Sequence, residues 1–363
     1  MNAPSNVENQ IRVMVVDDSA FMRFTIVKRI SASPRITVVG TARDGVEALE
    51  LIPKLNPDVI TLDVEMPRMD GLTTLKKIME LYPRPVIMLS SLTTEGTIET
   101  VQALTYGAVD FIAKPEMKAN MAAILENVEE KIIQAAKAKV WSVRRTKSQL
   151  AALGHQADYA QIKKAGYELR DIHDKDPIVV IGSSTGGPRA LNTLIPDLPR
   201  YPEAAYVVVQ HMPVGFTRSL AERLNLNSEL FVKEAEPGDK LKIGQVLLAP
   251  GGFHMVFDDK GQVSLNQNPP MHGVRPAVDV SLLSLAQHFG KRIISVTLTG
   301  MGSDGTTGAT LVHSSGGMVI AEAEESCVVW GMPRSVIEAG VADKILPLGS
   351  ISEEIVALIK GTS

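Results

Sequence analysis

The 363-residue sequence contains a single cysteine and no long apolar run. That cysteine, Cys327, excludes an intramolecular disulfide scaffold. No apolar stretch approaches the roughly 18–20 residues needed to span a bilayer, so we expect no direct membrane insertion. The first ten residues are polar and lack the apolar core of a secretory signal. These absences favour a protein of a reducing compartment, and we expect the cytoplasm.

Charge is unevenly distributed along the chain. The net charge is −5 over residues 1–130, +5 over residues 131–176 and −4 over residues 177–363. Hydrophobic residues make up 45% and charged residues 21% of the sequence, which excludes a mainly disordered or collagen-like chain. An acidic domain is a poor reader of duplex DNA, because contacts to phosphates supply most of the non-specific affinity. We therefore expect no nucleic-acid partner.

Short β-branched runs alternate with helical stretches in two parts of the chain. In the first part, strands are predicted at 11–16, 36–40, 57–63, 85–91 and 108–114, with a last helix from about 118. In the second part, strands are predicted at 177–182, 204–210, 246–251, 292–300 and 317–322, with helices around 187–196, 214–224, 279–290, 304–315 and 333–339. Such alternation is typical of parallel sheets covered by helices on both faces. We predict an α/β protein of two doubly wound domains, residues 1–130 and 177–363, joined by a basic linker at 131–176.

Polar residues gather at the predicted strand ends of the first domain. Asp17 and Asp18 follow the first strand, Asp63 ends the third, Ser90 ends the fourth and Lys114 ends the fifth. The carboxyl ends of parallel strands share one edge of the sheet, so these side chains should converge. Clustered carboxylates repel one another unless a cation lies between them, and hard oxygen ligands suit Mg²⁺. A carboxylate beside such a metal can attack a phosphoryl donor and form an acyl phosphate.

The first domain resembles the receiver domain of two-component response regulators over residues 11–130. The resemblance rests on the motifs VMVVDDSAFMR, LDVEMPRMDG, VIMLSS and DFIAKP. It implies a flavodoxin-like fold, Mg²⁺-dependent phosphorylation of Asp63 and a cis Lys114–Pro115 peptide. It also implies a set of metal ligands, namely Asp17, Asp18, Asp63 and the backbone carbonyl of Glu65. The residues implied to respond to the phosphoryl group are the switch hydroxyl Ser90, the phosphate partner Lys114 and the rotameric aromatic Phe111.

A glycine-rich turn opens the second domain. The segment Gly182-Ser183-Ser184-Thr185-Gly186 follows an apolar strand, precedes a helix and fits the G-x-S-x-G pattern of a nucleophile elbow. A serine at a helix N-terminus also has backbone amides nearby that could hold an oxyanion. A phosphate- or nucleotide-binding loop uses the same glycine-to-helix geometry. By itself, the motif leaves a serine nucleophile and a nucleotide-binding loop equally open.

A serine nucleophile needs a base and a group that orients the base. Among the seven histidines, His211 ends a predicted strand at the edge where Ser184 should lie, and His254 is a second candidate on a loop or a strand edge. Asp304 follows another strand end in a glycine-rich turn, where it could orient the imidazole. The competing interpretation of Asp304 is an N-cap of the helix that follows. Cys327 is flanked by apolar residues and is predicted to be a buried small side chain.

The second domain is similar to the bacterial chemotaxis protein-glutamate methylesterases, which also deamidate glutamine, over about residues 177–355. The similarity rests on IGSSTGGP, QHMPVGFTRSLAERL, APGGFHM, RPAVDV, TLTGMGSDG and ESCVVWGMPRSVI. It implies a Rossmann-like esterase domain with the catalytic residues Ser184, His211 and Asp304 and with no cofactor for the esterase reaction. Many members of that family have alanine where this chain has Ser183, which makes Ser184 the better nucleophile.

A receiver, a linker and an esterase in this order form the architecture of that family. The resemblance implies a phosphorylation-activated hydrolase that demethylates γ-glutamyl methyl esters, and deamidates glutamines, of methyl-accepting chemotaxis receptors. It also implies a chemotaxis histidine kinase as the phosphodonor. The alternative is a response regulator whose second domain binds receptors or a nucleotide without hydrolysis. The presence of Ser184, His211 and Asp304 favours the hydrolase.

Overall fold

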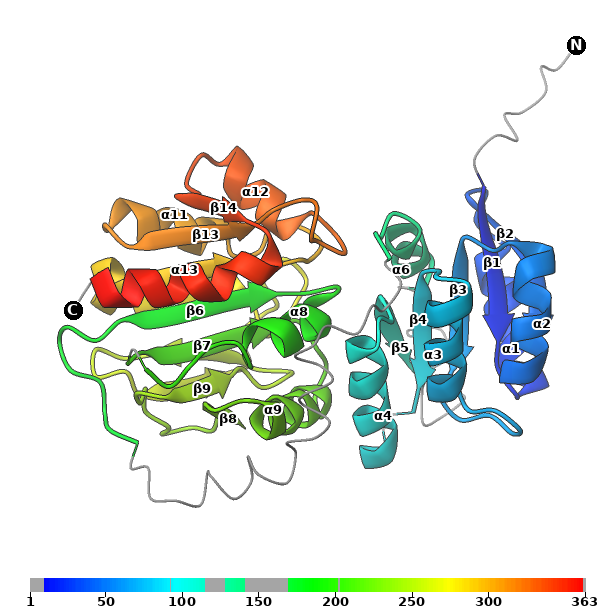
Figure 1. Ribbon diagram of the computed structural model, residues 1–363, viewed down its shortest axis with the longest axis horizontal. Coiled ribbons are helices and arrows are strands. Elements are labelled where there is room, and N and C mark those ends of the chain that lie inside the picture. The colour runs from blue at the N-terminus through cyan, green and yellow to red at the C-terminus, as the bar shows by residue number, and fades with distance from the viewer. Residues whose placement is uncertain (1–9, 92, 115–127, 141–168, 202, 362–363) are drawn as a thin grey trace, which may run out of the picture. The chain divides into compact units, whose positions relative to one another are not determined.

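The computed structural model describes residues 10–91, 93–114, 128–140, 169–201 and 203–361. The chain divides into two compact units, Met1–Arg144 and Arg145–Ser363 (Figure 1). Each unit contains its own parallel sheet. None of the described helices is long and apolar enough to cross a membrane.

The N-terminal unit is built on a five-stranded parallel sheet in the order β2-β1-β3-β4-β5. Its strands are β1 (Ile11–Val16), β2 (Ile36–Ala42), β3 (Val59–Asp63), β4 (Val86–Ser90) and β5 (Asp110–Ala113). Its helices are α1 (Ala20–Ile30), α2 (Gly45–Leu55), α3 (Gly71–Leu81), α4 (Thr94–Thr105) and α6 (Val128–Ala135). Polar side chains cap the N-termini of several of these helices. Ser19 accepts a backbone N–H of α1, Asp44 accepts two backbone N–H groups of α2, and Asp70 accepts one of α3.

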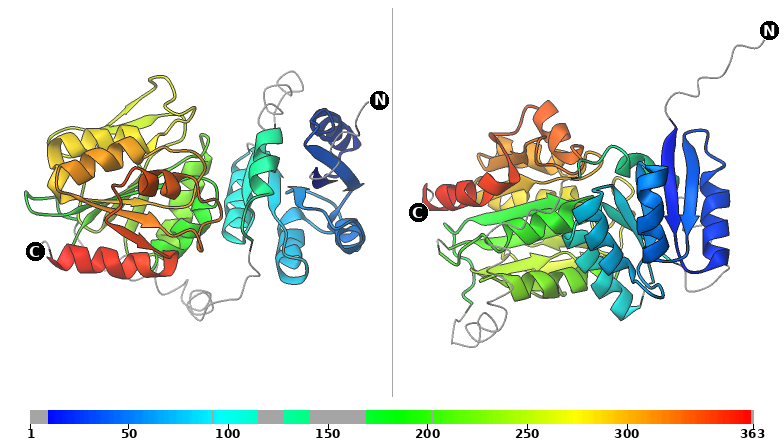
Figure 2. Two further views of the ribbon diagram at one scale, coloured as in Figure 1. Left: turned by 90° about the horizontal axis from the view of Figure 1, so that it is seen from above. Right: turned by 45° about the vertical axis from the view of Figure 1, so that its right-hand side comes forward.

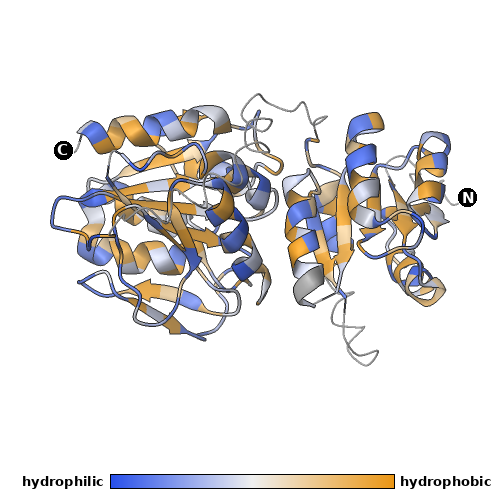
Figure 3. Cartoon of the chain, turned by 60° about the horizontal axis from the view of Figure 1, so that its bottom comes forward, coloured by the Kyte–Doolittle hydropathy of each residue, from blue (hydrophilic) through white to orange (hydrophobic). Residues whose placement is uncertain are grey.

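Helices cover both faces of this first sheet. Helix α3 contacts α2 and α4 on one face. On the other face, the Ser33 hydroxyl after α1 donates a 2.6 Å hydrogen bond to Glu129 of α6. Strands β3 and β4 are buried along their whole length, and Figure 3 shows the apolar colouring of the strands. Burial on both sides explains why these strands are continuous apolar runs rather than alternating ones.

The C-terminal unit is built on a seven-stranded parallel sheet in the order β14-β13-β12-β6-β7-β9-β8. Its strands are β6 (Ile178–Ser183), β7 (Ala205–Gln210), β8 (Phe231–Glu234), β9 (Gln245–Leu248), β12 (Ile293–Thr297), β13 (Met318–Glu322) and β14 (Lys344–Leu346). Its α-helices are α8 (Gly187–Leu194), α9 (Phe216–Asn227), α10 (Val278–Phe289), α11 (Thr306–Ser314), α12 (Met332–Glu338) and α13 (Leu348–Gly361). A separate antiparallel hairpin is formed by β10 (His254–Phe257) and β11 (Val263–Asn266).

The second sheet is also covered on both faces. Helix α8 contacts α9 and α13, whereas α11 contacts α10 and α12. Figure 2 shows α13, in red, across the sheet from the yellow and orange helices α10 and α11. The predicted fold class, two doubly wound parallel-sheet α/β domains, is therefore confirmed for both units.

Several elements were not predicted from the sequence. They are the strands β8 and β14, the hairpin of β10 and β11, and the helix α13. The predicted helix from about 118 lies partly outside the described residues, and within them the structure has α6 at Val128–Ala135. Of the predicted linker, residues 141–168 also lie outside the described residues.

Candidate functional site

Strand ends bring three carboxylates and an ammonium together at one edge of the N-terminal sheet. Asp17 and Asp18 follow β1, Asp63 ends β3, and Lys114 follows β5. One oxygen atom from each carboxylate lies within 4.8 Å of the others. The Lys114 Nζ atom is 2.7 Å from Asp63 Oδ2 and 2.9 Å from Asp17 Oδ2. The structure thus brings together the four charged residues that the sequence placed at this edge.

The electrostatics of this cluster favour a bound cation. Burial raises the pKa of Asp63 to about 7, with the charges of Asp17 and Asp18 adding to the rise and Lys114 opposing it. Burial also opposes the charge of Lys114, but the neighbouring carboxylates outweigh it, and the pKa of Lys114 is raised. Three hard oxygen donors, one of them on the exposed Asp18, form a donor set that fits Mg²⁺.

The remaining predicted residues of this first site lie around the cluster. Ser90 is buried, and its hydroxyl donates to the carbonyl oxygens of Ser91 and Gly96 at 3.1 and 3.0 Å. The Phe111 ring is buried, and the Lys131 ammonium lies 5.6 Å from its centroid. These contacts show how both side chains are held in this conformation.

Two further predictions concern the backbone near this cluster. Glu65 follows β3 directly after Val64, and its carboxylate accepts the Ser91 hydroxyl at 3.3 Å. Pro115, and with it the predicted cis peptide bond, lies outside the described residues. The described part of the chain has a cis peptide at Arg275–Pro276, which the sequence analysis missed.

The glycine-rich turn after β6 carries the two candidate serines. Ser183, the last residue of β6, is fully buried, and its hydroxyl donates to Gln210 Oε1 at 2.7 Å. Ser184 is half-buried and begins the turn into α8. Gly186 has φ 79°, a left-handed backbone that favours glycine. Of the two serines, Ser184 is therefore the accessible one.

His211 and Asp304 form a hydrogen-bonded pair. His211 follows β7, and its Nε2 atom is 2.7 Å from Asp304 Oδ2. The same carboxylate accepts the backbone N–H groups of Val278 and Asp279 at 2.7 and 2.9 Å. These amides belong to the first turn of α10, so Asp304 binds the N-terminus of that helix. Its interpretation as an N-cap of the helix that follows is wrong, because Gly305 occupies the N-cap position of α11.

Asp304 is held as an anion. Burial opposes its charge, but the hydrogen bond and charge of His211 and the two backbone N–H groups outweigh it, so the pKa of Asp304 is lowered. The anion keeps the proton of the neutral imidazole on Nε2, which leaves Nδ1 free to accept a proton. This pair is the arrangement expected of a general base and the residue that orients it.

Three adjacent strands carry the candidate triad. In the order β12-β6-β7, Asp304 lies beyond β12, Ser184 follows β6 and His211 follows β7. The backbone N–H of His211 donates to Ser183 O, and that of Ser184 donates to Thr299 O, both at 3.1 Å. The sheet thus brings all three candidates to the same edge.

Other candidate residues have different positions. His254 lies on β10 with its side chain buried, and its Nε2 is 3.2 Å from the Pro269 carbonyl oxygen. Cys327 is buried, as predicted, and its thiol forms no disulfide. The sequence analysis missed His272, whose Nε2 is 2.8 Å from Asp279 Oδ2 and 3.9 Å from Asp304 Oδ1. No pattern around His272 indicated this contact, because it depends on a loop folding back onto α10.

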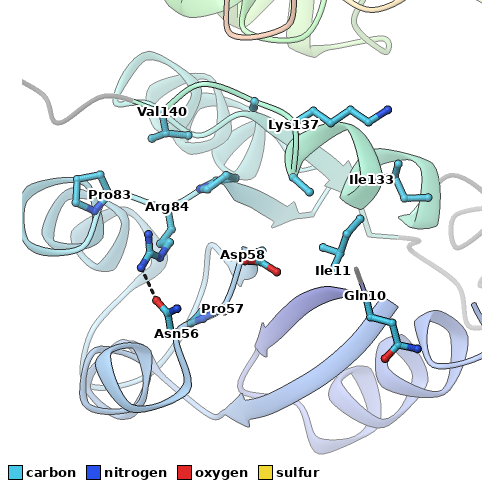
Figure 4. Close-up of a pocket in the computed structure, with 13 residues that line it drawn as sticks. Gln10, Ile11, Asn56, Pro57, Asp58, Pro83, Arg84, Ile133, Lys137 and Val140 are labelled. Carbon is cyan, nitrogen blue, oxygen red and sulfur yellow. Dashed lines mark hydrogen bonds between the residues drawn. The ribbon is translucent and has the colours of Figure 1, made fainter. Parts of the chain in front are cut away.

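A pocket of about 670 Å³ lies at the opposite edge of the N-terminal sheet (Figure 4). Its lining includes Ile11 at the start of β1, Asp58 before β3 and Arg84 before β4. A 2.6 Å hydrogen bond joins Arg84 to Asn56 there. None of the predicted site residues lines this pocket. It is therefore separate from the aspartate cluster.

Comparison with known protein families follows the division into two units. A family described as CheB methylesterase matches residues 179–355, and one described as response regulator receiver domain matches residues 13–126. Together these matches define a response regulator with a methylesterase domain.

Relatives cover nearly the whole chain. The protein-glutamate methylesterase/protein-glutamine glutaminase of Symbiobacterium thermophilum is 48% identical, over 96% of this chain and 97% of that protein. The protein of the same name from Thermotoga maritima is 46% identical, over 96% of this chain and 98% of that protein. The crystal structure of the Thermotoga maritima CheB methylesterase catalytic domain is 53% identical, with a TM-score of 0.49, and covers 50% of this chain and 98% of that one. The chain belongs to the family of protein-glutamate methylesterases/protein-glutamine glutaminases.

Proposed function

We propose that this protein demethylates γ-glutamyl methyl esters, and deamidates glutamine side chains, of chemotaxis receptors when its N-terminal unit is phosphorylated. The observation that carries the proposal is the 2.7 Å His211–Asp304 pair at the sheet edge where the Ser184 turn also lies. The names of the relatives supply the class of substrate.

The reaction assigns one role to each member of the triad. Ser184 Oγ attacks the ester carbonyl while His211 Nδ1 accepts its proton, and Asp304 holds the imidazole and stabilises the imidazolium that forms. The imidazolium then protonates the leaving group, which departs as methanol. Water, activated by His211, hydrolyses the acyl-enzyme and releases the glutamate. With a glutamine substrate the leaving group is ammonia.

Backbone amides of two turns would stabilise the tetrahedral oxyanion. The N–H of Gly187 already donates to Ser184 O at 2.8 Å, and that of Gly300 donates to Val329 O at 3.0 Å. The candidate donors to the oxyanion are therefore the backbone N–H groups at 185–186 and 301–302. Removing one such donor typically costs about 10²–10³ in kcat.

The N-terminal cluster would be the phosphoryl acceptor. The carboxylate of Asp63 attacks the phosphoryl group of the donor and forms an acyl phosphate as the donor's leaving group departs. Asp17, Asp18, Asp63 and the backbone carbonyl of Glu65 would hold Mg²⁺, which would neutralise negative charge as the phosphoryl group approaches. Lys114, already 2.7 Å from Asp63, pairs with one phosphoryl oxygen. Two further residues respond to the phosphoryl group, namely Ser90, whose hydroxyl turns to bind it, and Phe111, whose ring changes rotamer.

Phosphorylation would control the esterase through a shift between two states of the N-terminal unit. We divide the chain into a receiver at 1–130, a linker at 131–176, whose first residues complete helix α6 of the N-terminal unit, and a catalytic domain at 177–363. The phosphodonor is a chemotaxis histidine kinase, the substrate is a methyl-accepting receptor, and the reaction takes place in the cytoplasm.

The test is methanol release from membranes that contain methylated receptors. The full chain is compared with and without a small phosphodonor and Mg²⁺, beside Ser184→Ala and Asp63→Asn variants. We expect release that the phosphodonor stimulates, that Ser184→Ala abolishes, and that Asp63→Asn leaves unstimulated. Absence of release by wild type with confirmed phosphorylation would contradict the esterase activity on these receptors.

A further inference from the structure

The side chain of Gln210 hydrogen-bonds to the backbone of both Ser184, the proposed nucleophile, and His211, the proposed base. Gln210 ends β7 directly before His211, and it is 2% exposed. Its Nε2 donates to the carbonyl oxygens of Ser184 at 3.0 Å and His211 at 3.2 Å. Its Oε1 accepts the hydroxyl of Ser183 at 2.7 Å. A single buried amide therefore uses both donor hydrogens and its acceptor across two strand ends.

The turn is packed closely around this amide. A Cβ atom at Gly187 would lie 2.0 Å from Gln210 Oε1, so any other residue at this position would have to displace the amide. The carbonyl of Ser184 also accepts the Gly187 N–H, which holds the turn in a fixed conformation around the same point. The amide thus joins the turn to the end of β7 and contacts the backbone of the turn closely.

We propose that Gln210 is a positioning residue for the hydrolysis, because it sets the separation between Ser184 Oγ and the imidazole of His211. This inference rests on the proposed function. Proton transfer requires the nucleophile and base within hydrogen-bond reach, and a displacement of about 1 Å can cost about 10²-fold in rate. The hydrogen bonds of Gln210 go to backbone carbonyls and to Ser183, so its loss should lower kcat and leave KM unchanged.

Three variants separate the contacts of Gln210. Gln210→Leu has a similar volume and removes all three hydrogen bonds. Ser183→Ala is the matched control, because it removes only the bond to Oε1 and keeps both donations to the carbonyls. Gln210→Glu keeps the shape, but its ionised form places a carboxylate oxygen against the carbonyls of Ser184 and His211. Its protonated form regains one donor hydrogen.

The experiment measures two rates on the full-length protein, with folding checked by circular dichroism. One is phosphodonor-stimulated methanol release, and the other is labelling of Ser184 by phenylmethylsulfonyl fluoride, which needs no receptor. We expect Gln210→Leu to lose about 10²-fold in both rates at unchanged KM. Ser183→Ala should keep rates close to wild type. For Gln210→Glu, kcat relative to wild type at the same pH should rise as the pH falls.

Each outcome decides the inference. A folded Gln210→Leu protein with wild-type kcat, or with a change in KM alone, would overturn it, as would equal losses in Gln210→Leu and Ser183→Ala. If Gln210→Leu does not fold, the Gln210→Glu profile decides: a relative kcat independent of pH contradicts positioning through the donor hydrogens. If wild type is labelled but releases no methanol, the proposed function fails, and the labelling ratios still test Gln210.

Discussion

Replacing Asp304 tests its two roles, orientation of His211 and binding of the α10 N-terminus. Its Oδ1 accepts one N–H, from Asp279, whereas its Oδ2 accepts two, from Val278 and from His211 Nε2. In Asp304→Asn, an amide NH₂ group must replace one of these oxygens. Either orientation of the amide faces its NH₂ group toward a backbone N–H, so either leaves one backbone donor without an acceptor.

The expected loss in the free energy of unfolding depends on the number of backbone N–H donors that each substitution leaves unpaired. A buried polar group without its partner costs about 1–3 kcal/mol, so Asp304→Asn should lower the free energy of unfolding by about that amount. Asp304→Ala leaves both backbone donors unpaired, and its expected loss is about 2–6 kcal/mol. Because the pKa of Asp304 is lowered despite its burial, the stabilisation is present above the pKa of the unfolded carboxyl and is lost as pH falls through the folded-state pKa.

Urea denaturation at neutral and acid pH measures the losses in the free energy of unfolding. The rate of ester hydrolysis measures the orientation of His211. The Asn side chain can donate to Nε2 of His211 and so favour the tautomer with a proton on Nδ1, which cannot accept the proton of Ser184. In serine proteases this tautomer change costs about 10⁴-fold in kcat, and we expect a loss of that order here. Equal unfolding free energies for wild type and both variants, or near-wild-type kcat in Asp304→Asn, would refute the reasoning.

Three further predictions concern Ser184, Gly187 and Asp63. Ser184→Ala should abolish labelling by a serine-directed sulfonyl fluoride, whereas labelling at Ser183 in that variant would contradict its burial against Gln210. Gly187→Ala should lower both kcat and the urea midpoint, because its Cβ would lie 2.0 Å from Gln210 Oε1; an unchanged midpoint would count against this packing. Burial raises the pKa of Asp63 to about 7, so the stability of the metal-free protein should fall as pH rises from about 4 to about 7. Asp63→Asn should remove that slope in urea denaturation with EDTA, and a slope that persists would assign it to another group.

The central strands could be predicted from the sequence because both of their faces are buried. The predicted strands 57–63 and 85–91 correspond to β3 (Val59–Asp63) and β4 (Val86–Ser90), where every residue is buried. A continuous apolar run that ends in a polar residue marks both the strand and its carboxyl end. The same signal placed Asp63 and Ser90 at the carboxyl edge of the first sheet.

The elements at the margins of the C-terminal unit could not be predicted in the same way. Strands β8 and β14 are short edge strands with exposed residues, and the hairpin of β10 and β11 stands outside the main sheet. Their pairing is decided by tertiary contacts rather than by local pattern. Helix α13 is different, because Ile351, Ile355 and Ile359 are buried at helical spacing, a signal that was present in the sequence and not used.

Within the C-terminal site, the residue type decided which side chains could be predicted from the sequence. Serine, histidine and aspartate at neighbouring strand ends could be recognised as a set, although the serine turn alone also fits a nucleotide-binding loop and the aspartate alone also fits a helix N-cap. Gln210 carries no such signal, since an amide becomes informative only when its distant partners, Ser183 and Ser184 at 27 and 26 residues along the chain, are known. The sheet order β12-β6-β7 creates those partners, because Ser184 directly follows a strand that lies between the strands leading to Asp304 and His211. A proposed nucleophile between two other strand ends would need its spacing fixed on both sides. Thr299 fixes one side through the backbone of Ser184, and Gln210 fixes the other.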